Sequence, residues 1–313
     1  MINRRHIRIK VMQSAYALLQ TDNIQDIKSE EKFLLNNIQK LQELYVLMLD
    51  LLLKVKQEAA HILKISKNKY LATANDLKPN YKFIKNRLFK GLEMSPSLAT
   101  YIKDSELNLW QENNKYIRLI WDAIRQSNTY NVYMNSKKDS LSEDKNFMQT
   151  IYADIIATND KLYDFLEDFH IGWADDFPFV NTLIVKNINK FDKNNPFVIG
   201  KLYRDIEDAD FALNLFRKVV LNHHKFNEDI GKKTPNWEND RIADIDLILI
   251  KMALTEFCYF PSIPTKVSIN EYLEIAKDYS SQKSSSFING VLDKLLKEYQ
   301  SENKIKKIGR GLK

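Results

Sequence analysis

The chain has 313 residues, a formal net charge of +6 and a hydrophobic content of 44%, which together are typical of a globular protein with a sizeable core. Its 7 glycines and 7 prolines supply few of the turns that an all-β fold needs, so we expect an all-α fold of helical bundles. A single cysteine, Cys258, excludes an internal disulfide framework and favours a cytoplasmic location. The apolar runs 44–53 and 245–253 are too short for membrane spans, and we expect no signal peptide.

The basic residues concentrate at the two ends of the chain. Residues 1–20 hold four basic residues and no acid, and residues 294–313 hold seven basic residues and two acids, so the remainder sums to −3. Two interpretations stay open: solubilising tails, or an anionic partner. Of the anionic partners we favour nucleic acid over a membrane, because no large apolar face accompanies the charge.

The chain opens with a predicted helix over residues 4–20. Helical spacing gives it a buried row and a flanking polar face. The buried row is Ile7, Val11, Ala15 and Leu18; the flanking face is Arg5, Arg8, Met12 and Tyr16. Guanidinium groups suit phosphate oxygens and a tyrosine ring can stack a base, so this face is a candidate RNA contact. A surface helix with solvated arginines is the competing interpretation.

The middle of the chain is also predicted to be helical. A polar linker over residues 21–29 precedes a long helix over residues 30–65, whose apolar stripe is typical of a core seam. The stripe consists of Leu34, Ile38, Leu41, Tyr45, Met48 and Leu52. Further helices are predicted over residues 81–92 and 97–127, and a loop or domain boundary over residues 128–143.

A weak internal repeat is predicted around two Trp-x-x-Asp motifs. Trp173 with Asp176 and Trp237 with Asp240 each follow a helix and precede an apolar segment, at an offset of about sixty-four residues. Two unrelated helix pairs of similar length would give the same pattern.

The last third predicts a helix over residues 208–228, a second capped by Asn236 or Asn239, and a helical hairpin. Ser268 and Glu271 have the spacing of a capping box, and Val267 and Tyr272 that of a hydrophobic staple. A serine at 284–286 is predicted to cap the second hairpin helix, and the basic residues after Tyr299 are expected to form a flexible tail.

Catalytic patterns are lacking in the sequence. It contains no glycine-rich phosphate loop, His223 and His224 are adjacent and therefore poorly placed for one metal ion, and Cys258 lies among aromatic residues as a core filler would. We therefore expect a protein that is not an enzyme and needs no cofactor or metal.

Both ends of the chain resemble the NusB family of bacterial transcription antitermination factors. The resemblance covers about twenty residues at the start and ninety at the end. Its motifs are Arg4-Arg5-His6-Ile7-Arg8 with Gln13 and Tyr16, Asp240-Arg241-Ile242 with Asp246, Ala253-Leu254-Thr255-Glu256, Val267-Ser268-Ile269-Asn270-Glu271 and Phe287-Ile288-Asn289-Gly290-Val291-Leu292-Asp293.

The resemblance implies binding of boxA-type single-stranded RNA from ribosomal RNA operons. It implies a partnership with NusE, a small-subunit ribosomal protein, in an antitermination complex on RNA polymerase. It also implies that the loop 280–286 and Phe287 lie beside Arg5, Arg8 and Tyr16. Carried over by position, the RNA-binding residues are Arg4, Arg5, Arg8, Gln13, Tyr16, Ser286 and Phe287, with Lys283 added. Family members often carry an acid where this chain has Lys283, so we expect extra attraction for phosphate there.

The predicted organisation has three parts: an N-terminal helical region over residues 1–205 with a long insertion from residue 21, a NusB-like bundle over residues 206–300, and a basic tail over residues 301–313. Two other functions stay open. One is a helical scaffold for protein–protein interactions; the other is a stand-alone RNA-binding module related to that of ribosomal RNA cytosine methyltransferases.

Overall fold

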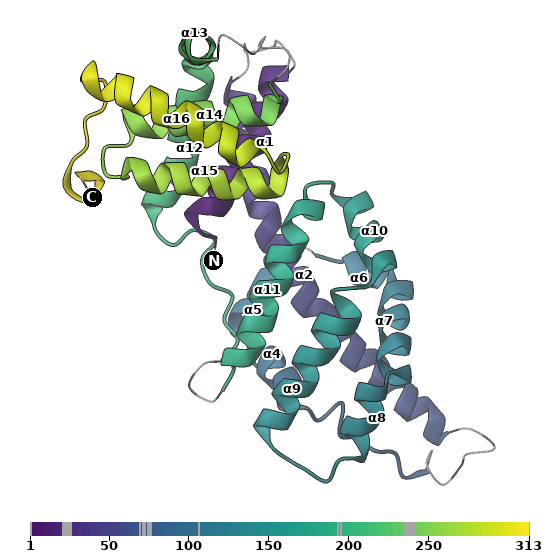
Figure 1. The fold of residues 1–313 in the computed structure, drawn as a ribbon. Coiled ribbons are helices and arrows are strands. Elements are labelled where there is room, and N and C mark those ends of the chain that lie inside the picture. The colour runs from purple at the N-terminus through teal and green to yellow at the C-terminus, as the bar shows by residue number, and fades with distance from the viewer. Residues whose placement is uncertain are drawn as a thin grey trace. The chain divides into compact units, whose positions relative to one another are not determined.

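The computed structural model describes residues 2–20, 27–68, 70, 73, 77–105, 107–192, 194, 196–234 and 242–312. Every regular element in these ranges is a helix, which confirms the all-α prediction (Figure 1). Within the same ranges, no helix is long and apolar enough to cross a membrane. The chain divides into two compact units, unit 1 with Met1–Ile38 and Lys201–Lys313, and unit 2 with Gln39–Gly200. The boundaries predicted at residues 205 and 300 stay a prediction.

Unit 1 is organised around a helix that is apolar on nearly all sides, α14 (Asp244–Tyr259). A helix of this kind is stable only when neighbours cover it all round. Five helices contact it, so the first helix of the chain and the last ones share one core. They are α1 (Arg4–Gln20), α12 (Ile206–Leu221), α13 (His223–Lys233), α15 (Thr265–Tyr279) and α16 (Ser284–Ser301).

Unit 2 is built along most of α2 (Ile27–Lys67), whose predicted apolar stripe is buried as expected. Two tryptophans attach later helices to it: the Trp110 indole donates to the Leu47 carbonyl, and the Trp173 indole donates to the Lys40 carbonyl. The later helices are α4 (Arg87–Glu93), α5 (Pro96–Asp104), α6 (Leu109–Glu112), α7 (Asn114–Gln126), α8 (Asn128–Asn135), α9 (Leu141–Ile151) with the π-turn η2 (Tyr152–Ile156), α10 (Asp160–Phe169) and α11 (Trp173–Lys190).

The predicted loop at 128–143 is largely wrong. Ser127 caps α8 by accepting from the Tyr130 amide, and Ser140 caps α9 in the same way, so only residues 136–140 connect two helices. Ser127 and Ser140 act here as helix caps rather than as linker residues, a distinction that composition alone does not make. The predicted helix at 208–228 is also interrupted, because α12 ends before Asn222.

The predicted capping box in the C-terminal hairpin is wrong as well. Pro264 precedes the first residue of α15, so the helix begins one turn earlier than expected. Ser268 is therefore inside the helix, where its hydroxyl donates to the Glu256 carboxylate at 2.6 Å. Val267 is 44% exposed while Tyr272 is fully buried, which excludes the predicted staple between them.

The tail is not free where the structure describes it. The Lys307 ammonium donates to the carbonyls of Glu256 and Phe260 at the end of α14, at 2.9 and 3.0 Å, and the Ile308 amide donates to Pro261. A side chain at Gly311 would overlap the Pro261 carbonyl. The expectation of a flexible tail is thus wrong for residues 307–311, which dock at the C-terminal end of α14.

The Trp-x-x-Asp repeat stays a prediction. Its first copy begins α11, where Trp173 and Asp176 are both buried. The second copy, Trp237 with Asp240, lies outside the described residues, as do the predicted caps Asn236 and Asn239. Arg241 of the central NusB-like motif also lies outside them.

Candidate nucleic-acid interface

Two of the predicted RNA-binding arginines, Arg4 and Arg5, line the accessible edge of α1. Their side chains are 38% and 42% exposed. The Arg4 Nε donates to Asp208 at 2.9 Å, and the Arg5 guanidinium forms two hydrogen bonds of 2.9 Å with Glu271. These bonds hold the pKa of the Glu271 carboxyl below its usual value. Each arginine is therefore oriented by an acid, while part of its side chain stays exposed.

Arg8 is placed differently, because it is only 3% exposed and points into unit 1. Its Nε and Nη2 donate to the two oxygens of the fully buried Glu256, at 2.7 and 3.1 Å. The hydroxyls of Ser268 and Tyr272 donate to the same carboxylate at 2.6 and 2.7 Å. Burial opposes the charge on Arg8, yet Glu256 and Tyr272 raise its pKa above the usual value. This network joins α1 to α14 and α15.

Glu256 accepts four hydrogen bonds, and these offset the free-energy cost of burying its negative charge. Arg8 also lies 3.6 Å from Glu271, the acid that holds Arg5. The two arginines and two acids therefore alternate in one chain of ion pairs. It runs from the buried side of α1 to its accessible edge, and the structure brings Arg5 and Arg8 together as predicted from their spacing.

Gln13 and Tyr16 lie farther along α1, and both are half-buried. The flanking face predicted for α1 is therefore only partly on the surface. Arg5 and Tyr16 are partly accessible, whereas Arg8 and Met12 are buried. Eight residues separate Arg8 from Tyr16, or about 12 Å along the helix axis.

The other predicted residues meet at the first turn of α16. Lys283 and Ser286 are exposed, and Phe287 is half-buried. Lys283 and Phe287 line a pocket of about 240 Å³ that also receives the Asp246 side chain. The lining residues are Ile242, Ala243, Asp246, Ser281, Lys283, Ser284 and Phe287.

Serine hydroxyls fix the wall of this pocket. Ser280 donates to Asp246 at 2.6 Å, and Ser284 lies 2.9 Å from Ser280 and 2.8 Å from Ser281 through their hydroxyl oxygens. None of the serines 284–286 caps α16 with its side chain, because Lys283 occupies the N-cap position. A cation, an aromatic ring and a carboxylate therefore surround one small cavity, which is a set of groups suited to an unstacked base.

The two groups of predicted residues lie at different ends of α14. Glu256, which holds Arg8, and Asp246, which lines the pocket, are ten residues apart, or about 15 Å along the axis. The expectation that the loop 280–286 and Phe287 lie beside Arg5, Arg8 and Tyr16 stays a prediction. An extended RNA strand spans such a distance in a few nucleotides.

The family model described as the NusB family matches residues 187–297. A transcription antitermination protein NusB from Salinibacter ruber is 43% identical over 111 residues, which is 36% of this chain and 69% of that protein.

The chain belongs to the NusB family.

Two further NusB proteins show similar identity. The NusB protein of Chloroherpeton thalassium is 44% identical over 34% of this chain and 51% of its own length. The NusB protein of Clostridium kluyveri is 42% identical over 32% of this chain and 62% of its own length. The chain thus spans between about half and two thirds of these NusB relatives. No solved structure was found to match it. The matched range includes the α16 turn and excludes α1 and nearly all of unit 2.

Sequence reasoning missed the acids that organise the interface. Glu256 and Glu271 were quoted as parts of NusB-like motifs, but their arginine partners are 248 and 266 residues away. No local spacing links residues so far apart, so the ion pairs become visible only in the fold.

Proposed function

We propose that this NusB-family protein is an RNA-binding transcription antitermination factor rather than an enzyme. In this account unit 1 binds boxA-type RNA of ribosomal RNA operons together with NusE, and the pair joins an antitermination complex on RNA polymerase. The observation that carries the proposal is the combination of family membership with an interface of two kinds: accessible arginines on α1, and a small aromatic-lined pocket at the start of α16.

The arginine edge supplies phosphate contacts. The Arg5–Glu271 pair is solvent-accessible, and ion pairs of this kind contribute about 0–1 kcal/mol to stability. A phosphate can therefore compete with Glu271 for the Arg5 guanidinium, and with Asp208 for that of Arg4. Asp208 and Glu271 already orient the two arginines before RNA binds, which lowers the entropy lost on binding.

The pocket at the start of α16 supplies a base contact. The Phe287 ring offers a π-face, Asp246 offers an acceptor for a base N–H group, and Lys283 offers a charge for the adjacent phosphate. The residues from Ser280 to Ser286 position these groups through the hydroxyl network around Asp246. Ser286 is exposed at the same turn, and in this proposal it contacts the ribose or phosphate.

Arg8 supports the interface from inside unit 1. A direct contact with RNA would require its guanidinium to leave the buried Glu256, which is unfavourable. We therefore propose that Arg8 positions α1, and through Glu271 also Arg5, whereas Gln13 and Tyr16 extend the contact along the accessible edge.

The proposal is tested by binding of the full chain to a boxA RNA and to a scrambled RNA of equal composition, each with and without NusE. We expect tighter binding of boxA, a further gain when NusE is present, and an affinity that falls as salt rises. Equal affinity for the two RNAs in both conditions would contradict the proposal. Failure to co-purify NusE would favour the scaffold interpretation.

A further inference from the structure

Unit 2 contains a strongly basic segment outside the range that matches the NusB family. Residues 64–90 include eight basic residues and one acid, although the chain between its two basic ends sums to −3. This segment runs from the last turn of α2 to the first half of α4. A local excess of charge of this size raises the local concentration of anionic ligands.

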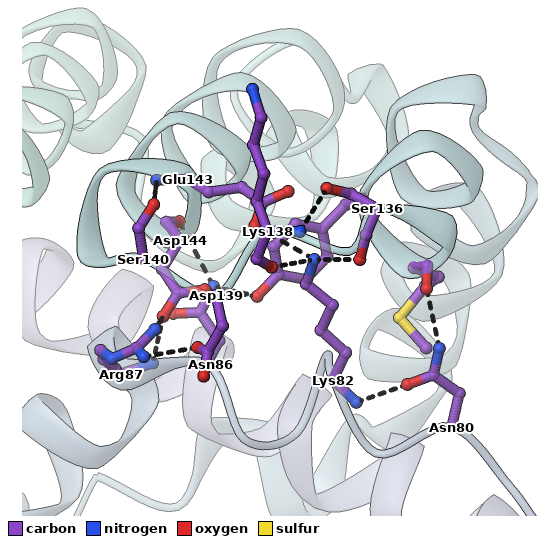
Figure 2. Close-up of polar contacts among 12 residues, drawn as sticks. Asn80, Lys82, Asn86, Arg87, Ser136, Lys138, Asp139, Ser140, Glu143 and Asp144 are labelled. Carbon is purple, nitrogen blue, oxygen red and sulfur yellow. Dashed lines mark hydrogen bonds and ion pairs between the residues drawn. The ribbon is translucent and has the colours of Figure 1, made fainter.

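In the described part of this segment, two of the cations are held by carbonyl or carboxylate oxygens. The Lys82 ammonium donates to the carbonyls of Ser136 and Lys138, both at 2.9 Å, and to the Glu143 carboxylate at 3.1 Å (Figure 2). The Arg87 guanidinium bonds to Asp139 and Asp144, which ties α4 to the start of α9 (Figure 2). These contacts fix the connection between α8 and α9, so Lys82 and Arg87 have structural roles.

Besides Lys90, four other described lysines of the segment are exposed. Lys64, Lys67, Lys78 and Lys85 are all exposed, and no ion pair joins any of them to an acid among the residues that the structure describes. Other acids near this end of α2 already have cations, since Glu58 pairs with Arg118 and Glu93 with Lys56.

A tyrosine holds two of these lysines together. The ammonium groups of Lys67, from α2, and Lys85, from the segment before α4, lie 5.3 and 5.7 Å from the centre of the Tyr81 ring. The electron-rich ring face offsets part of their mutual repulsion. Lys64 lies one helical turn before Lys67 on the same face of α2. The segments that meet here therefore concentrate positive charge around one aromatic side chain, and we call Lys64, Lys67, Lys78, Tyr81 and Lys85 the Tyr81 patch.

We propose that the Tyr81 patch is a second RNA-binding surface, which binds the phosphate backbone of single-stranded RNA without sequence preference. It rests on the proposed function only in taking RNA as the ligand. A phosphate would relieve the repulsion between Lys67 and Lys85, and the fully exposed Tyr70, three residues after Lys67, offers a further stacking face. In this account unit 1 selects the boxA sequence, and unit 2 lengthens the bound segment and strengthens binding through avidity.

The test compares charge-reversal variants of the full chain in binding a 30-nucleotide polyuridine, measured by fluorescence anisotropy over a salt series. In Lys67→Glu/Lys85→Glu we expect at least tenfold weaker binding at low salt. Removing two phosphate contacts should also reduce the slope of log affinity against log salt by about 1.4. Tyr81→Leu should weaken binding by about fivefold or more without a change of charge.

The matched control is Lys103→Glu/Lys186→Glu, which changes the charge equally at exposed lysines elsewhere in unit 2. Lys186 precedes Asn187, which donates to the Tyr45 hydroxyl on α2, and Tyr45 is about 28 Å along the helix from Lys64. We expect little change in this control. Equal losses in both double variants, or no loss in Lys67→Glu/Lys85→Glu, would overturn the proposal.

Two further measurements separate this proposal from its alternatives. Binding of a short boxA RNA should be nearly unchanged in Lys67→Glu/Lys85→Glu, so a failure of boxA recognition in the wild type would count against the proposed function alone. The patch could instead pair with α10 of a second copy, which carries Asp160, Asp164, Glu167 and Asp168. A concentration-dependent dimer in sedimentation without RNA, abolished by Lys67→Glu/Lys85→Glu while polyuridine binding persists, would overturn the RNA proposal.

Discussion

Arg8 and Glu256 form a buried ion pair that joins the first helix of the protein to the central helix of unit 1. The two residues are 248 positions apart, their shortest contact is 2.7 Å, and neither side chain is more than 4% exposed. Ser268 and Tyr272 complete the hydrogen bonding of the carboxylate. Residues 187–297, which the family model matches, are therefore joined by this ion pair to a helix that lies far outside that range in the sequence.

Breaking this pair should strongly destabilise unit 1. In Arg8→Ala the Glu256 charge stays buried without its main partner, so we expect a loss of about 3–5 kcal/mol in the free energy of unfolding. Denaturant titration followed by circular dichroism measures this loss. The control is Arg4→Ala, which removes an accessible ion pair and should cost less than about 1 kcal/mol. Similar losses in the two variants would contradict the structural role assigned to Arg8.

Replacing Phe287 should affect RNA binding far more than folding. Loss of a stacked base corresponds to about 1–3 kcal/mol, so Phe287→Ala should weaken boxA binding by roughly 5- to 150-fold. Anisotropy with labelled boxA RNA measures the change. Phe33→Ala is the matched control, because Phe33 is a 51% exposed phenylalanine of unit 1 outside the proposed interface. The pocket would have no role in binding if the two variants bound equally well.

The buried Lys251 should make the stability of the protein rise with pH in the alkaline range. Its side chain is 3% exposed and its ammonium lies 2.9 Å from the His223 Nδ1; burial lowers its pKa to about 8, although Asp244 acts in the opposite direction. The unfolded chain holds this proton up to about pH 10.4, so between pH 8 and 10.4 it binds more protons than the folded protein, and stability due to this group rises with pH.

The comparison with Lys251→Met isolates that contribution. Below pH 8 the wild type bears the cost of a buried charge that the variant lacks. As the pH rises from 8 to 10.4 the wild type should gain about 3 kcal/mol relative to the variant. Denaturation midpoints measured for both proteins across this range test the prediction. A constant difference would show that Lys251 titrates normally.

The docked tail should be released by a single methyl group. Because a Cβ at residue 311 would overlap the Pro261 carbonyl, Gly311→Ala should displace residues 307–311 and free the Lys307 ammonium from the end of α14. We expect faster cleavage after Lys306 and Lys307 in limited trypsin digestion followed by mass spectrometry. Gly290→Ala serves as the control, since its Cβ meets nothing within 4 Å and should stabilise α16. Unchanged cleavage in Gly311→Ala would contradict the docking.

Much of the helical architecture could be predicted because periodicity is a local property. The bounds of α1 and the buried stripe of α2 follow from apolar residues at helical spacing. The start of α15 could not be predicted in this way, because the helix begins directly after Pro264 and not at the more conspicuous Ser268–Glu271 pair. Glu271 instead pairs with Arg5, and Ser268 donates to Glu256, which is the partner of Arg8.

The candidate site was predictable only in part, for a related reason. The arginines of α1 and Phe287 can be recognised by their motifs, but the burial of Arg8 depends on an acid that only the fold brings near. The Tyr81 patch could have been found from sequence by a local count of charge over residues 64–90; a sum over the whole middle of the chain conceals it.

The central claim is that unit 1 recognises boxA RNA through α1 and the start of α16. Photo-crosslinking of the full chain to boxA RNA that carries 4-thiouridine, followed by mass spectrometry of the adducts, tests it most directly. We predict adducts on peptides containing Tyr16 and Phe287, with competition by unlabelled boxA RNA but not by scrambled RNA. Adducts confined to unit 2, or equal competition by the two RNAs, would contradict the account.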